Sequence, residues 1–238
     1  MTHHRYSSLW VGIDGGREGL WREPIWSGVL RIIERHQGEQ VYDKESPIYL
    51  DLESEFPNEA WRSATSDGKF RPLFRDYPNS WTRTGVISLE KKQFALTLLG
   101  RAVLDGNTSK SAVFIEMFKN HSEISKDTNL RENPFEILSA AFLEANRPLS
   151  TNEIYWAVMR NYRPRTERLI ESLLHVRNML SAQPDPTPSR RLKNMLSTMR
   201  AADLIMSTRR GKMVYWAPLE QELLREIAGL KSKAQGVG

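Results

Sequence analysis

The chain has 238 residues, of which 39% are hydrophobic and 26% are charged, so it can form one large domain or two small ones. It contains no cysteine, which excludes disulfides, thiolate nucleophiles and cysteine-ligated zinc or iron–sulfur sites. No apolar run has the length of a membrane span, and the N-terminus lacks the apolar region of a secretory signal. We therefore expect a soluble, cytoplasmic protein with no membrane partner.

The net charge of +5 is distributed unevenly along the chain. Residues 1–60 contain six Lys/Arg and eleven Asp/Glu, whereas residues 160–212 contain twelve Lys/Arg and four Asp/Glu. A basic region of this kind is typical of a protein that binds a polyanion. A solvated helical face explains the same excess of cations, so charge alone leaves both interpretations open.

The N-terminal part combines a glycine-rich arm with the first helix. Residues 1–20 contain four glycines that interrupt any periodic pattern, so we expect an irregular arm there. From Pro24, apolar residues recur at helical spacing until Gly38, which predicts a helix. The following polar stretch predicts loops around a short helix over 57–64.

Helix, hairpin and helix follow one another over residues 70–104. A helical segment over 70–81, interrupted by Pro78, precedes two short apolar runs on either side of a charged tip made of Glu90, Lys91 and Lys92. This pattern predicts a β-hairpin. Thr97 then stands at the N-cap position of the helix "LLGRAVL".

A similar order of elements is predicted in the second half. A connecting helix over 110–121 and a polar joint near 120–132 lead to a helix over 134–145, opened by Asn133-Pro134. Ser150 and Glu153 form a capping box, whose Glu is three residues after the N-cap. The remaining predicted elements are a helix over 165–180, a proline-rich loop over 181–189, a basic helix over 189–202, a hairpin over 204–216 and a C-terminal amphipathic helix.

The two hairpins and their flanking helices indicate an internal repeat. Three helices followed by a hairpin is the order of a winged helix, in which the third helix enters the major groove and the hairpin is the wing. The predicted fold is mainly α with small β-hairpins (α+β), as two tandem winged-helix domains. We divide the chain into an N-terminal arm (1–20), domain 1 with a connecting helix (21–120), domain 2 (133–218), and a C-terminal helix and tail (219–238).

Short motifs over residues 24–218 resemble the paired winged-helix recognition regions of type IIS and related restriction endonucleases. They are an LT-x-x-G-x-x-L element (Leu96, Thr97, Gly100 and Val103/Leu104) and the Asn133-Pro134 opening of the next domain. The resemblance implies a DNA-binding module from a restriction or phage-defence system. It also implies that other subunits of such a system are partners, and homodimerisation stays open.

Catalytic and metal-binding patterns are weak in this sequence. A PD-(D/E)xK nuclease needs clustered carboxylates beside a lysine. Asp51, Glu53 and Glu55 alternate along the chain, but no lysine follows at the required distance, so we interpret them as a solvated acidic strand or loop. No histidine has a partner at zinc-site spacing, and no Walker loop is present. We expect no cofactor, no metal and no enzymatic activity.

The predicted DNA contacts lie mainly in domain 2. On the basic helix, arginine and asparagine are the side chains that read guanine and adenine edges, and the hairpin tip supplies cations for phosphates. Met213, Tyr215 and Trp216 are interpreted as packing residues. The predicted DNA-binding residues are Arg190, Arg191, Lys193, Asn194, Ser197, Arg200, Arg209, Arg210, Lys212, Arg83, Lys91 and Lys92. Arg160, Arg163, Arg165 and Arg168 add a second basic run.

Two alternatives compete with double-stranded DNA binding by a non-catalytic recognition or accessory subunit. The first is a winged-helix protein-interaction subunit that resembles the kleisin-associated subunits of bacterial SMC complexes. Trp10, Trp21 and Trp26 would belong to its interface. The second is a small metal-dependent nuclease that uses Asp51, Glu53 or Glu55.

Overall fold

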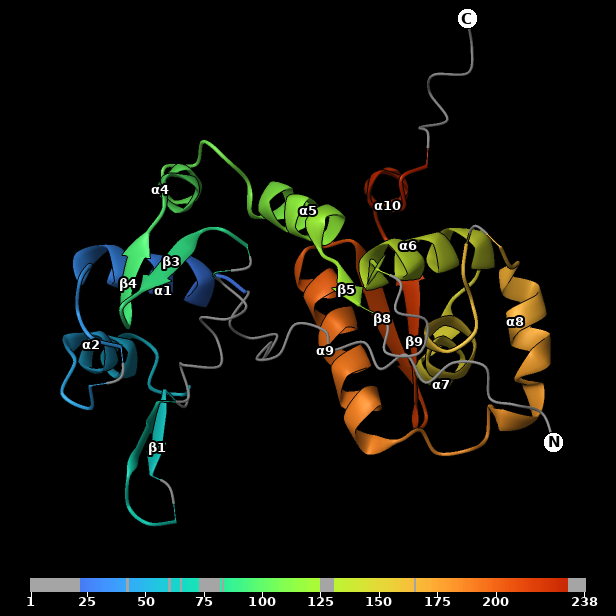
Figure 1. Cartoon of the computed structure of the whole chain (residues 1–238), viewed down its shortest axis with the longest axis horizontal. Coiled ribbons are helices and arrows are strands. Elements are labelled where there is room, and N and C mark those ends of the chain that lie inside the picture. The colour runs from blue at the N-terminus through green and yellow to red at the C-terminus, as the bar shows by residue number, and fades with distance from the viewer. Residues whose placement is uncertain are drawn as a thin grey trace, which may run out of the picture. The chain divides into compact units, whose positions relative to one another are not determined.

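The computed structural model describes residues 22–41, 43–59, 61–64, 66–72, 82, 84–124, 131–164 and 166–230. The chain forms two compact units that divide between Met117 and Phe118, inside helix α5 (Lys110–Asn120) (Figure 1). We call them the N-terminal and the C-terminal unit. Both combine helices with small antiparallel sheets, as an α+β fold requires. Among the described residues, no helix is both long and apolar enough to cross a membrane.

The N-terminal unit packs helices around a short hairpin. Its helices are α1 (Ile25–Arg35), α2 (Pro47–Glu55) and α4 (Leu98–Leu104), together with the first part of α5. Its strands are β1 (Arg62–Ala64), β2 (Phe70–Pro72), β3 (Ile87–Glu90) and β4 (Gln93–Leu96), paired as β1-β2 and β3-β4. The core is built from Val29, Ile32 and Ile33 of α1 with Leu52 of α2 and Phe94 of β4, all fully buried.

The β3–β4 hairpin and the cap that follows it have the predicted form. Glu90 pairs with Gln93, so Lys91 and Lys92 make a two-residue loop in which both φ angles are positive, at 48° and 67°. The Thr97 side chain caps α4 by accepting a hydrogen bond from the Gly100 N–H at 3.1 Å. This confirms the hairpin and the N-cap that the sequence predicts.

The acidic part of the N-terminal unit differs from the prediction. The helix lies at Pro47–Glu55 and not over 57–64, where residues 62–64 form strand β1. Pro47 occupies the first helical turn, and Ile48, Tyr49 and Leu52 are buried on α2, so burial of one apolar face decides where the helix forms. Of the helix predicted over 70–81, residues 70–72 form strand β2 instead and 73–81 lie outside the described residues.

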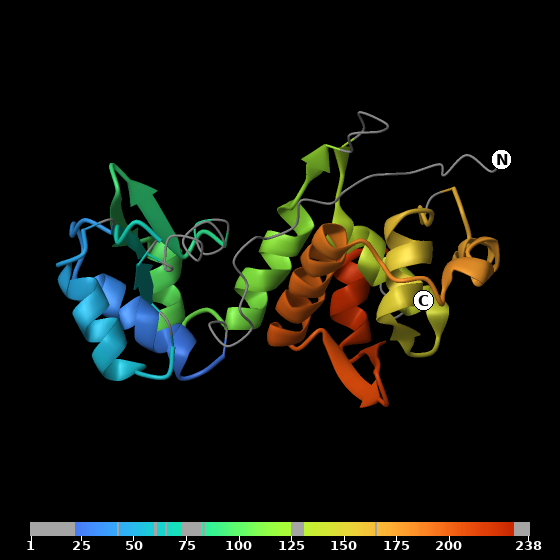
Figure 2. The same ribbon diagram turned by 90° about the horizontal axis from the view of Figure 1, so that it is seen from below.

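The C-terminal unit places helices around a three-stranded sheet (Figures 1 and 2). The sheet consists of β7 (Leu149–Ser150), β8 (Ile205–Arg210) and β9 (Met213–Pro218) in the antiparallel order β7-β9-β8. The helices are α6 (Pro134–Ala145), α7 (Thr151–Glu153), the π-helical turn η3 (Ile154–Met159), α8 (Leu169–His175), the 3-10 turn η4 (Arg177–Met179), α9 (Pro186–Ala201) and α10 (Gln221–Ile227). A small ribbon of β5 (Glu123–Ile124) and β6 (Arg131–Glu132) precedes them.

Local signals fix the helix starts in this unit. Asn133 caps α6 by accepting a hydrogen bond from the Phe135 N–H at 2.9 Å. Ser150 and Glu153 form the predicted capping box, with reciprocal hydrogen bonds of 3.2 and 2.7 Å. Glu153 is half-buried, which by itself raises its pKa, but hydrogen bonds from Arg147 and Ser150 outweigh burial and hold the pKa below its ordinary value.

Two helices begin or end at residues other than those predicted from the sequence. The helix predicted over 165–180 is confined to α8 and the short turn η4, with Val176 as the C-cap of α8. The proline-rich loop ends earlier than predicted, because Pro186 opens α9 from its first turn.

Candidate nucleic-acid interface

Helix α9 presents one polar stripe and one apolar side. Arg190, Lys193, Asn194 and Ser197 follow the spacing i, i+3, i+4, i+7, so they lie on one face of the helix. Arg190 and Lys193 are exposed, and Asn194 and Ser197 are partly exposed. The apolar side anchors the helix through Leu192, Met195, Leu196 and Met199, all fully buried. The α9 stripe, as we name these four residues, is therefore free to meet a ligand.

The β8–β9 hairpin lies beside α9 and ends in a basic tip (Figure 2). Arg210 pairs with Met213, so Gly211 and Lys212 form a two-residue loop. Gly211 takes a φ of 60°, and nothing lies near the position of an added Cβ, so the glycine serves the turn and not close packing. Arg209, Arg210 and Lys212 are exposed and are called the hairpin tip below.

Contacts of the tip arginines stay within the hairpin. The Arg209 Nε–H donates to the carbonyl of Gly211 at 3.2 Å, and the Arg210 guanidinium lies 5.6 Å from the Tyr215 ring centroid. Trp216 is buried, and its indole N–H donates to Thr151 at 2.9 Å, so it is a packing residue as predicted. Neither tip arginine needs to leave an ion pair in order to bind a phosphate.

Among the residues that the structure describes, no carboxylate pairs with the exposed cations of the stripe or the tip. Residues 186–216 contain seven Lys/Arg and one acidic residue, Asp203. Within the described parts of the chain, no ion pair involves Arg190 or Lys193 of the stripe, or any of the three cations of the tip. The result is a local excess of positive charge on α9 and the hairpin that follows it.

Two arginines of α9 depart from the predicted outward position. Arg191 is only partly exposed, and its buried Nε has no hydrogen-bond acceptor among the described residues. Arg200, which the sequence places outward, turns to the hairpin instead: its guanidinium lies 5.6 Å from the Trp216 ring centroid and donates a hydrogen bond to Ser207 Oγ. Spacing alone misplaces Arg200 because the hairpin that follows α9 offers its long side chain closer partners.

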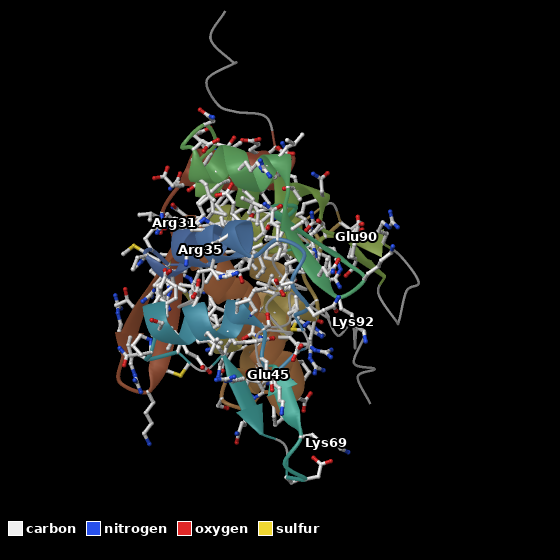
Figure 3. The ribbon with its side chains drawn as sticks, turned by 90° about the vertical axis from the view of Figure 1, so that its left-hand side faces the viewer. Arg31, Arg35, Glu45, Lys69, Glu90 and Lys92 are labelled. Atoms are coloured by element: carbon white, nitrogen blue, oxygen red, sulfur yellow. The ribbon has the colours of Figure 1, made fainter. Side chains whose placement is uncertain are left out.

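Of the DNA-binding residues predicted in the N-terminal unit, the structure describes those at the tip of the β3–β4 hairpin. Lys91 and Lys92 are exposed there, and Figure 3 shows Lys92 and Glu90 at this hairpin. Glu90 immediately precedes them, so this tip carries less net positive charge than the tip of the C-terminal unit. Arg83 lies outside the described residues.

The predicted acidic strand is part of helix α2, and its carboxylates diverge. Asp51 and Glu55 are four positions apart, so they lie on one face of the helix and both pair with Arg35, whereas Glu53 pairs with Arg62 Nε at 2.6 Å. The hydrogen bond from His36 at 2.8 Å, together with Arg35, lowers the pKa of Asp51 despite partial burial. These carboxylates act as partners of nearby cations that hold the unit together.

The second basic run is also occupied by structural pairs. Arg160 donates to Asp185 at 2.7 Å and lies over the rings of Tyr155 and Trp156. Arg163 binds both carboxylate oxygens of Glu132, at 2.8 and 3.2 Å, with both side chains largely buried. Arg165 lies outside the described residues, and Arg168 is exposed. Arg160 and Arg163 therefore differ from the cations of the tip, because each of them is paired with a carboxylate.

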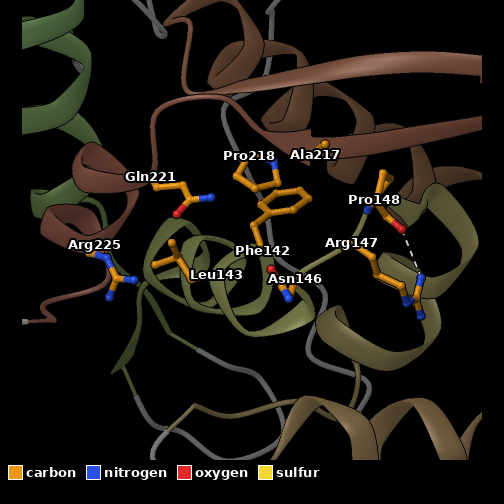
Figure 4. A pocket seen from close by; sticks show the side chains of 9 residues that line it. All are labelled: Phe142, Leu143, Asn146, Arg147, Pro148, Ala217, Pro218, Gln221 and Arg225. Carbon is orange, nitrogen blue, oxygen red and sulfur yellow. Dashed lines mark hydrogen bonds between the residues drawn. The ribbon is translucent and has the colours of Figure 1, made fainter. Parts of the chain in front are cut away.

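A pocket of about 480 Å³ lies where α6, β9 and α10 meet (Figure 4). Phe142, Leu143 and Pro218 are among its apolar lining residues. Its two arginines already have partners: Arg147 binds Glu153 at 2.7 Å and the Pro148 carbonyl at 3.0 Å, and Arg225 lies 3.5 Å from Glu222. It is thus less suited to an anion than the surface of α9 and the hairpin tip.

The chain matches no known protein-family model and no curated protein in sequence. In fold it is similar to the BpuJ1 endonuclease binding domain, whose crystal structure was solved in complex with pyrene- and phenanthrene-modified DNA. The similarity covers 95% of this chain and 89% of that chain, with a TM-score of 0.57 and 12% sequence identity. At this identity the similarity shows a shared fold.

Proposed function

We propose that this chain is a non-catalytic protein that binds double-stranded DNA through the α9 stripe and the hairpin tip. The observation that carries the proposal is the group of exposed cations, two on the stripe of α9 and three on the tip of the hairpin packed against α9, that have no carboxylate partner among the described residues. Such cations gain affinity for DNA by releasing counterions from phosphates. Ion-paired arginines such as Arg163 gain less, because their carboxylate has to be left behind.

The order of elements in the C-terminal unit supports a winged helix. Helix α6, the helix formed by α7 and η3, and helix α9 precede the β8–β9 hairpin, with α8 and η4 inserted between η3 and α9, and β7 adds a third strand. In this arrangement α9 is the recognition helix and the hairpin is the wing. The β3–β4 hairpin is the corresponding wing of the N-terminal unit, with Lys91 and Lys92 on phosphates.

Side chains, and not the helix N-terminus, would have to provide the contacts of α9. An α-helix of 10–12 Å diameter fits the major groove, and helix N-termini often bind phosphate through free N–H groups. Pro186 and Pro188 remove two of these N–H groups, and the Ser189 N–H already donates to the Asp185 carbonyl at 3.0 Å. Base reading therefore falls to Arg190 and Asn194, whose geometries suit guanine and adenine.

The structural neighbour and the acidic residues support the remaining parts of the proposal. The neighbour is the binding domain of an endonuclease held on DNA, which suits a recognition or accessory subunit of a bacterial restriction or phage-defence system. Asp51, Glu53 and Glu55 are engaged with Arg35 and Arg62, which favours a non-catalytic role. Trp26 is buried against Phe114, at 6.1 Å between ring centroids, so it does not support the SMC-like interface.

A salt titration of duplex binding tests the proposal. The full chain is titrated with a fluorescent random duplex at several salt concentrations between 50 and 200 mM, with and without Mg²⁺. We expect log K to fall linearly with log salt, at a slope of about −0.9 for each phosphate contacted, with no cleavage. Absence of binding at micromolar concentration in 50 mM salt would refute DNA binding, and Mg²⁺-dependent nicking would refute the non-catalytic role.

A further inference from the structure

Arg200 occupies the corner between the recognition helix and the hairpin. It follows Ser197 by three positions, so its Cα continues the α9 stripe, but its side chain turns toward the sheet. The guanidinium lies over the Trp216 ring and donates to Ser207, and Ser207 is the strand partner of Trp216. One arginine therefore holds α9 against both strands of the hairpin.

The hydrogen bonds continue from this corner into the rest of the unit. The Trp216 indole N–H donates to Thr151 Oγ1 at 2.9 Å, and the Thr151 hydroxyl donates to the Val214 carbonyl at 3.2 Å. The start of α7 thereby fixes β9 from the side opposite β8. Ser207 lies two residues before Arg209 on β8, so any tilt of the strand at Ser207 is carried directly to the hairpin tip.

We propose, on the basis of the proposed DNA binding, that Arg200 is a positioning residue for the wing and not a phosphate contact. It sets the angle between α9 and the β8–β9 hairpin so that the α9 stripe and the hairpin tip meet the same duplex. Preorganisation of this kind raises affinity because the free protein already has the bound arrangement. The tip is otherwise attached to α9 through the short turn at Ala202–Leu204 and strand packing.

A double-mutant cycle with the tip tests this role. The variants are Arg200→Met, the tip triple variant Arg209→Ala/Arg210→Ala/Lys212→Ala, and their combination, each measured by duplex binding across salt concentrations. We expect Arg200→Met alone to weaken binding about three- to tenfold, with the salt slope unchanged. In the tip-variant background it should change affinity less than about twofold, because the contacts that it positions are gone.

Arg190→Met is the matched control, since it removes the same side chain from the same helix at an exposed position. It should weaken binding equally in both backgrounds and reduce the magnitude of the slope by up to about 0.9. The same behaviour by Arg200→Met would overturn the positioning role while leaving DNA binding intact. If neither Arg190→Met nor the tip variant alters binding, the proposed function itself fails.

Arg200→Lys separates position from charge and also guards against a variant that fails to fold. Lysine keeps the positive charge but lacks the planar guanidinium that stacks on Trp216 and reaches Ser207. We expect it to bind about as weakly as Arg200→Met, while thermal melting shows that the chain is still folded at the temperature of the binding assay. Full recovery of affinity by lysine would show that Arg200 acts only through its charge and would overturn the proposal.

Discussion

Removal of the hairpin-tip cations should weaken DNA binding without damage to the fold. In the variant Arg209→Ala/Arg210→Ala/Lys212→Ala, three exposed positive charges are lost while the turn glycine is kept. The lost interactions within the protein are small: one hydrogen bond from Arg209 to the Gly211 carbonyl and the contact of Arg210 with Tyr215. Such surface changes alter the free energy of unfolding by about 0.5 kcal/mol or less.

The expected change in binding follows from the number of phosphates that the tip can reach. Each lost phosphate contact reduces the magnitude of the log K against log salt slope by about 0.9, so three contacts account for up to about 2.7. Because the contribution of counterion release falls as salt rises, the loss of affinity should be larger at 50 mM salt than at 200 mM, by up to about 40-fold. The effect should be similar for duplexes of different sequence, since phosphate contacts carry no sequence information.

Fluorescence anisotropy with labelled duplexes gives both affinity and slope, and the matched control is Arg168→Ala/Arg177→Ala. These arginines are exposed cations at the two ends of α8, on the other side of the C-terminal unit from α9 (Figure 1). If the control lowers the slope as much as the tip variant does per charge, overall charge explains binding. An unchanged slope in the tip variant would refute the assignment of the tip to phosphates.

Three further predictions test the other unit, its packing and the capping box. Lys91→Asn/Lys92→Gly keeps the positive φ angles of the β3–β4 loop and removes two cations. The magnitude of the slope of log K against log salt should therefore decrease by up to about 1.8, with no loss of stability on thermal melting. Gly100→Ala would place a Cβ 2.1 Å from the Val86 carbonyl oxygen, so hydrogen exchange of residues 86–104 should accelerate as stability falls by about 1–3 kcal/mol, whereas amides of the C-terminal unit should not change. Glu153→Gln should lower the free energy of unfolding by about 1 kcal/mol at pH 7. Because the folded-state pKa of Glu153 is lowered, the difference in thermal stability between the variant and wild type should shrink as the pH falls through that pKa. A difference that stays constant with pH would exclude the carboxylate charge as its cause.

Structural elements that depend on residues close together in the sequence were predictable from the sequence alone. Both hairpins, the Thr97 and Asn133 caps and the Ser150–Glu153 box depend on neighbours within four positions or on a tight turn. The apolar side of α9 was also visible, because its period matches a helix. These features were sufficient to locate α9 and the β8–β9 hairpin, which are the proposed recognition helix and wing.

The sequence-based predictions were wrong where residues far apart in the sequence determine the structure. Helix α2 was missed because its short apolar side is recognisable only once it packs against α1, and the sequence shows mainly its carboxylates. Arg200 was misplaced because Trp216 and Ser207, which hold it, come from the following hairpin. No local sequence pattern reveals such partners. The position of a long charged residue on a helix therefore predicts where its Cα lies, but not where its charged group lies.

Partners, and not the number of cations, decide which basic segment can bind an anion. The run from Arg160 to Arg168 looks as basic in sequence as the hairpin tip, but Arg160 and Arg163 are held by Asp185 and Glu132. A phosphate would have to replace these carboxylates and would gain little net energy, because an established ion pair would be lost. At the tip no such exchange is needed. A protein with a net charge of only +5 can therefore present a strongly basic surface, provided that its acidic residues are committed elsewhere.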